Sequence, residues 1–120
     1  MASKSTLEQK FLLNWQKRYP RIPLETEQTF IPGRKFRADF LHRESRVAIE
    51  CQGAIWSPKG GHSGGTGIES DYIKFCHAAA AGWTVFPLSS KMIDDPQYLD
   101  MIAATILERV EDEDKEFSIA

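Results

Sequence analysis

Apolar residues near the start of the chain recur at helical spacing. In the stretch "STLEQKFLLNWQKRYP", Leu7, Phe11 and Trp15 follow one another at intervals of four. Pro20 ends the pattern, because a proline inside a helix removes a backbone donor and clashes with the preceding turn. The pattern predicts an amphipathic first helix.

The next three stretches have the patterns of strands. "TEQTFIPG" is a short extended segment that ends in a Pro-Gly turn, and "KFRADFLH" is strand-like around its apolar residues. "SRVAIECQG" is a nearly continuous apolar run that follows the turn "HRES". Together they predict a meander in which residues 46–51 form a central strand.

The second half begins with a glycine-rich stretch. "GAIWSPKGGHSGGTG" contains six of the eight glycines and a proline, which predicts a long loop of the kind that is often functional. "IESDYIKFCHAAAAG" is helical with Gly82 as its C-terminal cap, and "WTVFPL" is a short buried strand. The final stretch, "DPQYLDMIAATILERV", predicts a helix with four buried positions: Leu99, Ile102, Ile106 and Val110.

The predicted element order is α-β-β-β-α-β-α. A strand that follows a crossover helix usually runs parallel to a neighbour in the same sheet, so this order predicts an α/β fold with a mixed central sheet flanked by helices. The length of 120 residues suits a single domain. We expect its core to cover about residues 5–110 and an acidic tail to cover residues 111–120.

The net charge of −2 hides an asymmetry, since residues 1–60 carry +5 and residues 61–120 carry −7. Such a split indicates a side that faces a polyanion, although the acidic tail alone accounts for much of the negative half. The start of the chain lacks the apolar stretch of a secretion signal, and no apolar run is long enough to cross a bilayer. We therefore expect an intracellular, cytoplasmic protein without membrane contact.

Two cysteines occur, Cys51 in an apolar strand and Cys76 in a helical pattern. This placement predicts buried free thiols in a reducing compartment rather than a disulfide framework. A structural zinc site is disfavoured because the histidines and cysteines lack paired ligand spacing, and a Cys-His protease is disfavoured because neither cysteine is placed as a nucleophile.

Two carboxylates interrupt the predicted strands, Asp39 in the second and Glu50 in the third. A carboxylate in a central strand is costly unless something compensates its charge. If the strands pair through the short turn, opposing residue numbers sum to about 89, which puts Asp39 across from Glu50. A divalent cation would relieve their repulsion, and oxygen ligands favour Mg²⁺ or Mn²⁺ over zinc. The alternative is that the acids pair with nearby arginines, of which three are available: Arg37, Arg43 and Arg46.

An acid in the second strand and "ECQ" at the end of the third, within this element order, resemble the PD-(D/E)XK nuclease superfamily. The stretch from "IECQGAIW" to "GWTVFPL" is similar to small phage and mobile-element nucleases related to the very-short-patch-repair group. The resemblance covers roughly residues 5–88. It implies a restriction-endonuclease-like fold and hydrolysis of DNA phosphodiester bonds that depends on Mg²⁺, with Mn²⁺ able to substitute.

Carried over by position, the resemblance implies that Asp39, Glu50 and the backbone carbonyl of Cys51 are the metal ligands. Gln52 occupies the place where the family usually has lysine. Its amide can orient an attacking water but cannot supply positive charge to the transition state. Lys74, on the following helix, could supply that charge from another direction.

Glu8 matches a glutamate that family members often place on the first helix near the metal. It has an alternative role, because "STLE" is a capping box in which Glu8 satisfies backbone donors at Ser5. Lys74 likewise has the alternative of a surface ion pair with Asp71, three residues before it.

Candidate DNA contacts come from the glycine-rich loop and from the basic first half. Lys59 and His62 add donors to a loop whose backbone amides can approach phosphates, although a plain linker remains the alternative. The basic residues expected to contact the DNA backbone are Lys10, Lys17, Arg34, Lys35, Arg37 and Lys59. A domain with one active site must assemble into a homodimer or higher homo-oligomer to cut both strands.

Three functions stay open on the sequence. The first is a metal-dependent DNA endonuclease of homing, junction-resolving or repair type. The second is a catalytically inactive nuclease-fold module that binds DNA, which the glutamine at position 52 supports. The third is an α/β protein whose acids are purely structural.

Overall fold

The structure is a computed structural model, and it describes residues 6–52 and 65–110. Most of the predicted glycine-rich loop and the whole predicted acidic tail lie outside these ranges. The elements, in chain order, are α1 (Thr6–Arg18), β1 (Glu25–Thr29), β2 (Arg37–His42), β3 (Val47–Cys51), α2 (Gly65–Ala80), β4 (Thr84–Leu88), α3 (Ser90–Ile93) and α4 (Pro96–Arg109). The predicted α/β class and element order are confirmed, and the four-residue helix α3 is an addition that the sequence pattern did not predict.

The four strands form one sheet in the order β1-β2-β3-β4. The first three strands are antiparallel, whereas β4 runs parallel to β3 after the crossover through α2. Strands β2 and β3 pair as Phe40 with Ile49 and Leu41 with Ala48, which is the register predicted from the short turn. Strand β3 is therefore central, as expected.

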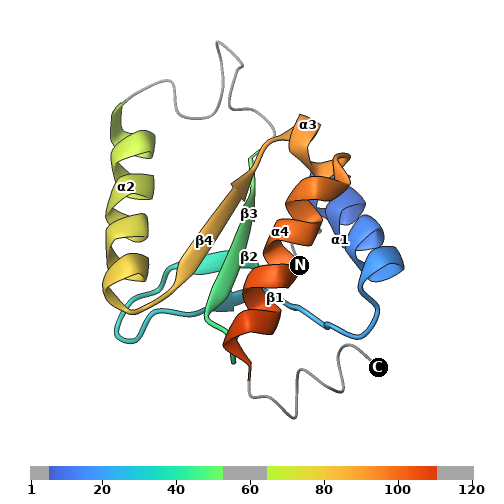
Figure 1. The fold of residues 1–120 in the computed structure, drawn as a ribbon. Helices are drawn as coiled ribbons and strands as arrows, with labels where there is room; N and C mark the ends of the chain where they lie inside the picture. The colour runs from blue at the N-terminus through green and yellow to red at the C-terminus, as the bar shows by residue number, and fades with distance from the viewer. Residues whose placement is uncertain (1–5, 53–64, 111–120) are drawn as a thin grey trace.

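Helices cover both faces of the sheet. Figure 1 shows α1, α3 and α4 on one side of the sheet and α2 on the other. The larger core joins Phe11 and Trp15 of α1 to the apolar side of α4 and to Ile49. All four positions predicted for the last helix are buried, namely Leu99, Ile102, Ile106 and Val110. The smaller core under α2 contains Leu41, Ala48, Ala78, Trp83 and their neighbours.

Alternation along β3 decides which way its side chains point. Val47 and Ile49 enter the larger core, and Cys51 packs against it, whereas Ala48 enters the smaller core. Glu50 shares the face of Ala48, so its side chain is directed toward α2. The strand thereby brings a carboxylate under the crossover helix.

Both cysteines are free, but they differ in exposure. Cys51 is half-buried, whereas Cys76 is exposed, so the prediction of a buried thiol is wrong for Cys76. The reason is that α2 covers the sheet with one side, on which Ala78 is fully buried, and Cys76 lies on the other. None of the helices in the described parts of the chain combines the length and apolarity needed to span a bilayer.

Candidate active site at the end of strand β3

Glu50 is a nearly buried carboxylate at the end of the central strand. Its side chain is 12% exposed, and its Oε1 accepts a hydrogen bond of 3.0 Å from Nζ of Lys74. Its Oε2 is buried and has no hydrogen-bond partner among the described residues. Burial raises the pKa of Glu50, the ammonium of Lys74 opposes this rise, and the charge of Asp39 adds to it. One carboxylate oxygen is thus available to a further partner.

Asp39 lies beside Glu50 on the neighbouring strand. Its Oδ2 accepts a hydrogen bond of 2.8 Å from the backbone N–H of Cys51. The observed register, continued by one pair beyond Phe40 and Ile49, sets Asp39 opposite Glu50. The carboxylate of Asp39, which β2 carries, therefore lies against β3 and next to the carboxylate of Glu50.

Lys74 reaches this pair from α2. Its Nζ donates to Oε1 of Glu50 and also to the backbone carbonyl of Arg37, at the start of β2. Lys74 faces the sheet because it lies four residues before the fully buried Ala78, on the same side of the helix. Its ion pair is with Glu50 rather than with Asp71, so the structure does not bear out the alternative of a surface pair with Asp71.

The arginines proposed as alternative partners of the acids are directed elsewhere. Arg43 pairs with Glu25 at 3.2 Å, and Arg46 donates to the carbonyl of Ala81 at 3.0 Å. Arg37 is exposed and contributes its backbone carbonyl to Lys74. The positive charge beside Glu50 comes from a lysine on α2 instead.

Glu8 and Gln52 complete the set that the sequence singled out here. Burial raises the pKa of the Cys51 thiol to about 12, and the charges of Asp39, Glu8 and Glu50 add to the rise. The half-buried Glu8 of α1 therefore lies within electrostatic reach of the end of β3. The N–H of Gln52 donates to the carbonyl of Leu88 at 2.8 Å, which continues the pairing of β3 with β4.

Other predicted residues lie away from this site or outside the described ranges. Lys59 and His62 fall in the undescribed segment, as does Ser5 of the proposed capping box. Lys35 is exposed on the loop before β2, and Lys10 pairs with Asp94 at 2.9 Å on the far side of the sheet.

A hard divalent cation fits the donors at the end of β3. Within residues 6–52 and 65–110, no three His, Cys, Asp or Glu side chains are grouped closely enough to hold a metal by themselves. Mg²⁺ does not require such a group, because it usually binds one or two carboxylates and completes its shell with water and substrate phosphate. The buried Oε2 of Glu50, next to Asp39, is an oxygen donor of the kind that such a cation selects.

One contact in the site could not be predicted from the sequence, namely the bond from Lys74 to the backbone carbonyl of Arg37. Every residue carries a carbonyl, so no residue type or spacing could have singled this one out. The position of Lys74 relative to β2 and β3 alone reveals the contact.

The fold is similar to that of a nuclease domain of known structure. The structure described as "Homing Endonuclease I-Bth0305I Catalytic Domain" matches with a TM-score of 0.64 and 16% sequence identity, over 90% of this chain and 100% of that one. At this identity the likeness concerns the fold. No family model matches the sequence, and a search of curated proteins found no match.

Proposed function

We propose that this protein is a metal-dependent DNA endonuclease of the PD-(D/E)XK type that hydrolyses phosphodiester bonds. The observation that carries the proposal is the buried Oε2 of Glu50, which has no hydrogen-bond partner among the described residues and lies next to the carboxylate of Asp39. A buried acceptor without a partner is costly, so its retention here favours a ligand that binds it. The likeness in fold to a homing endonuclease catalytic domain supports the same proposal.

Asp39 and Glu50 would hold Mg²⁺ or Mn²⁺, with the backbone carbonyl of Cys51 as a third protein ligand. The bond from the Cys51 N–H to Asp39 fixes that carboxylate against β3. A bound cation supplies the Lewis acidity and the activated water that phosphodiester hydrolysis requires. The two strands position both carboxylates before any cation binds, which reduces the reorganisation needed at the site.

Lys74 and Gln52 divide the work that the family usually assigns to one lysine. Lys74 holds Oε1 of Glu50 and so leaves Oε2 for the cation, and it keeps a positive charge beside the reaction centre. Gln52, next to Cys51 at the end of the strand, would orient the attacking water through its amide. Glu8 would act from α1 as a further acid near the cation.

The DNA would contact exposed donors around this site. Lys35 and Arg37 are exposed at the entry to β2, and Arg37 is tied to the site through its carbonyl. Lys59 and His62 would make further contacts with the DNA. Because a single site cuts one strand, double-strand cleavage would require a second copy of the chain, as a homodimer or larger homo-oligomer.

We further propose that the enzyme is encoded by a phage or mobile element and acts in homing, junction resolution or repair. The compared domain bears the name of a homing endonuclease, which favours the first of these roles. The preferred substrate decides among them. Linear duplex, nicked plasmid, flap and four-way junction DNA should be compared side by side.

The test is cleavage of those DNAs with Mg²⁺, with Mn²⁺ and with EDTA. Wild-type protein should cut only with metal, and Asp39→Asn and Glu50→Gln should each lower the rate by at least about a hundredfold while DNA binding is retained. Asp94→Asn is the matched control, because Asp94 is an exposed acid whose ion pair lies outside the site. Unchanged cutting by either site variant would remove the assignment.

A second function, DNA binding without cleavage, is favoured by Gln52, which replaces the usual lysine with an uncharged amide. In that case the wild-type protein would bind DNA tightly, with strong salt dependence, and would cut none of the substrates with either metal.

A further inference from the structure

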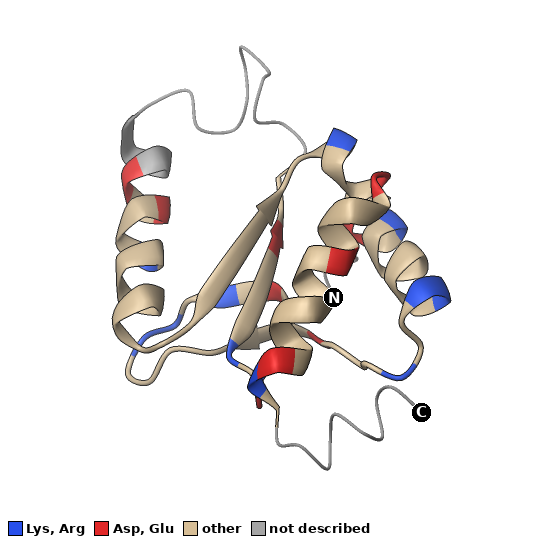
Figure 2. Ribbon diagram, viewed as in Figure 1, with Lys and Arg blue, Asp and Glu red and all other residues tan. Residues whose placement is uncertain are grey.

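The segment between β1 and β2 concentrates positive charge. We define the basic loop as residues 30–37, "FIPGRKFR", which includes the first residue of β2. It carries Arg34, Lys35 and Arg37, all exposed, and no acid. Figure 2 shows its blue segments beside α2, on the opposite side of the sheet from α1 and α4.

Aromatic and apolar contacts hold the basic loop against the smaller core. The ring of Phe30 meets that of Trp83 edge-on, with 4.9 Å between centroids, and Ile31 is buried. Gly33, at a φ of 78°, turns the chain, and the N–H of Arg34 donates to the carbonyl of Ile31 at 3.1 Å. The far end is fixed by the bond from Lys74 to the Arg37 carbonyl. The loop is therefore anchored at both ends.

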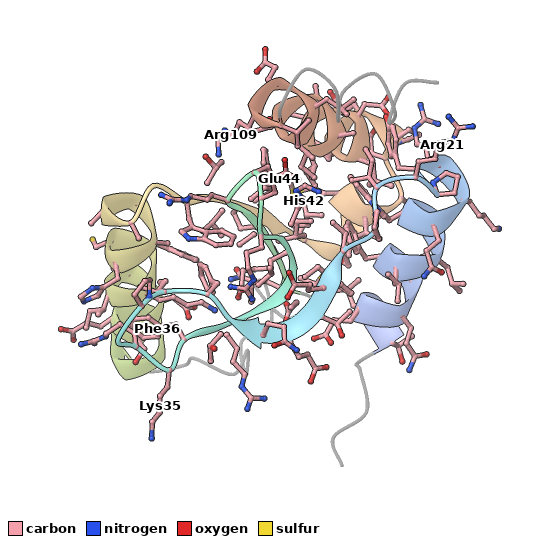
Figure 3. The ribbon with its side chains drawn as sticks, turned by 90° about the horizontal axis from the view of Figure 1, so that it is seen from below. Arg21, Lys35, Phe36, His42, Glu44 and Arg109 are labelled. Carbon is pink, nitrogen blue, oxygen red and sulfur yellow. The ribbon has the colours of Figure 1, made fainter. Side chains whose placement is uncertain are left out.

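Three planar groups contact one another along the basic loop and onto α2. The ring of Phe36 lies 5.8 Å from the ring of His77, and the guanidinium carbon of Arg34 lies 5.0 Å from the centroid of Phe36. In Figure 3, Phe36 lies beside α2, whereas Lys35 points away from the molecule. Stacking on a ring restricts a guanidinium and leaves the edges that donate hydrogen bonds available, which suits a phosphate.

On the other face of the sheet, two of the cations of α1 are paired with carboxylates. Arg18 of α1 contacts Asp100 at 2.6 Å, and Lys10 contacts Asp94 at 2.9 Å. By contrast, Arg34, Lys35 and Arg37 form no ion pair with any residue in the described ranges. A polyanion that approached Lys10 or Arg18 would have to compete with their carboxylate partners, and one that approached the basic loop would not.

We propose that the basic loop is the surface that holds the DNA backbone, with Arg34, stacked on Phe36, as its principal phosphate contact. The inference rests on the proposed endonuclease function and adds to it which face the DNA uses and which residue is preorganised. Lys74 joins this surface to the site, because its ammonium bonds both the Arg37 carbonyl and Glu50. One lysine therefore contacts both the basic loop, which would bind the DNA backbone, and Glu50, the carboxylate that would bind the metal. The face formed by α1 and α4 takes no part.

The experiment measures binding of a labelled DNA duplex by fluorescence anisotropy in EDTA, at several salt concentrations, so that no cleavage is needed. Arg34→Gln should weaken binding by about tenfold and reduce the salt slope by about one unit. Arg34→Lys should keep the slope and lose affinity, because a lysine neither stacks nor donates in a fork. Phe36→Leu should likewise keep the slope and lose affinity, since it removes the ring under Arg34 and leaves the charge of the guanidinium.

Arg18→Gln is the control, because its guanidinium is paired with Asp100 on the opposite face. It should leave affinity and salt slope unchanged, and thermal unfolding should verify that all variants are folded. If the wild-type protein binds DNA and Arg34→Gln binds it with the same affinity, or if Arg18→Gln loses affinity, this inference is overturned while the proposed function stands. Failure of the wild-type protein to bind any DNA would overturn both.

Discussion

At the scale of single residues, Glu50 shows how a buried carboxylate is balanced. Its Oε1 is held by Lys74, while its Oε2 has no partner among the described residues, so one oxygen is compensated and the other is left for a ligand. The pKa of Glu50 is raised by burial, which means that the charged form is held at a cost in this structure. Lys74 and a divalent cation would therefore act on the same carboxylate from two sides.

This arrangement makes a prediction about metal binding in the absence of DNA. Lys74→Met removes a positive charge that repels the cation and should tighten Mn²⁺ binding by about tenfold, which corresponds to about 1.4 kcal/mol, while slowing cleavage. Isothermal titration calorimetry measures the affinity. Lys91→Met is the control, since Lys91 is an exposed lysine on α3. Weaker Mn²⁺ binding in Lys74→Met would show that Lys74 positions Glu50 more than it competes with the metal.

The acids themselves could be predicted because a local rule places them. A short turn fixes the register of β2 on β3, so the residue numbers alone set Asp39 across from Glu50. No such local rule identifies the partner of Glu50. Lys74 lies 24 residues away, and neither its choice over the arginines nor its second bond to Arg37 follows from spacing.

At the scale of elements, the end of α2 depends on one glycine. Gly82 adopts a φ of 84°, and the N–H of Trp83 returns to the carbonyl of Ala78 at 2.9 Å, so the predicted cap is confirmed. A Cβ at Gly82 would lie 3.0 Å from Nη1 of Arg46, whereas one at Gly33, whose φ is 78°, would meet nothing within 4 Å. The two glycines therefore share a backbone conformation and differ in their surroundings.

We expect Gly82→Ala to destabilise the protein by about 2 kcal/mol and Gly33→Ala by about 1 kcal/mol. Both variants carry the cost of a left-handed backbone conformation. Gly82→Ala must also displace the Arg46 guanidinium, which donates to Ala81. Urea unfolding measures both values. In an Arg46→Ala background the difference between the two should vanish, and a difference that persists there would locate its cause outside Arg46.

At the scale of the whole molecule, the two cores are unequal. Helix α4 buries Leu99, Ile102, Ala103 and Ile106 in the larger core. Helix α2, over the residues whose side chains are described, contributes only Ala78 as a fully buried residue. Over its described side chains, the helix that carries Lys74 therefore has fewer fully buried residues than α1 or α4.

Local opening should follow this difference, because regions with little buried apolar surface open at lower free energy than the core. Amide hydrogen exchange, followed by mass spectrometry, should show faster exchange in peptides from α2 than in peptides from α4. Glu50→Gln should accelerate α2 further by weakening the bond to Lys74, with α4 as the internal reference. Equal protection of the two helices would mean that α2 is held as firmly as the main core.

The order of the elements, the alternation of side chains along β3 and the register of the two acids follow from local sequence, because periodicity and turn length are properties of neighbouring residues. The contacts between distant groups follow from the folded chain. The bond of Lys74 to Glu50 and Arg37, the exposure of Cys76, and the pairing of α1 cations with Asp94 and Asp100 all depend on how helices pack against the sheet. Helix packing is set by side-chain fit across the whole core, and a spacing pattern along one segment indicates the side that packs but not the distant residues that it meets.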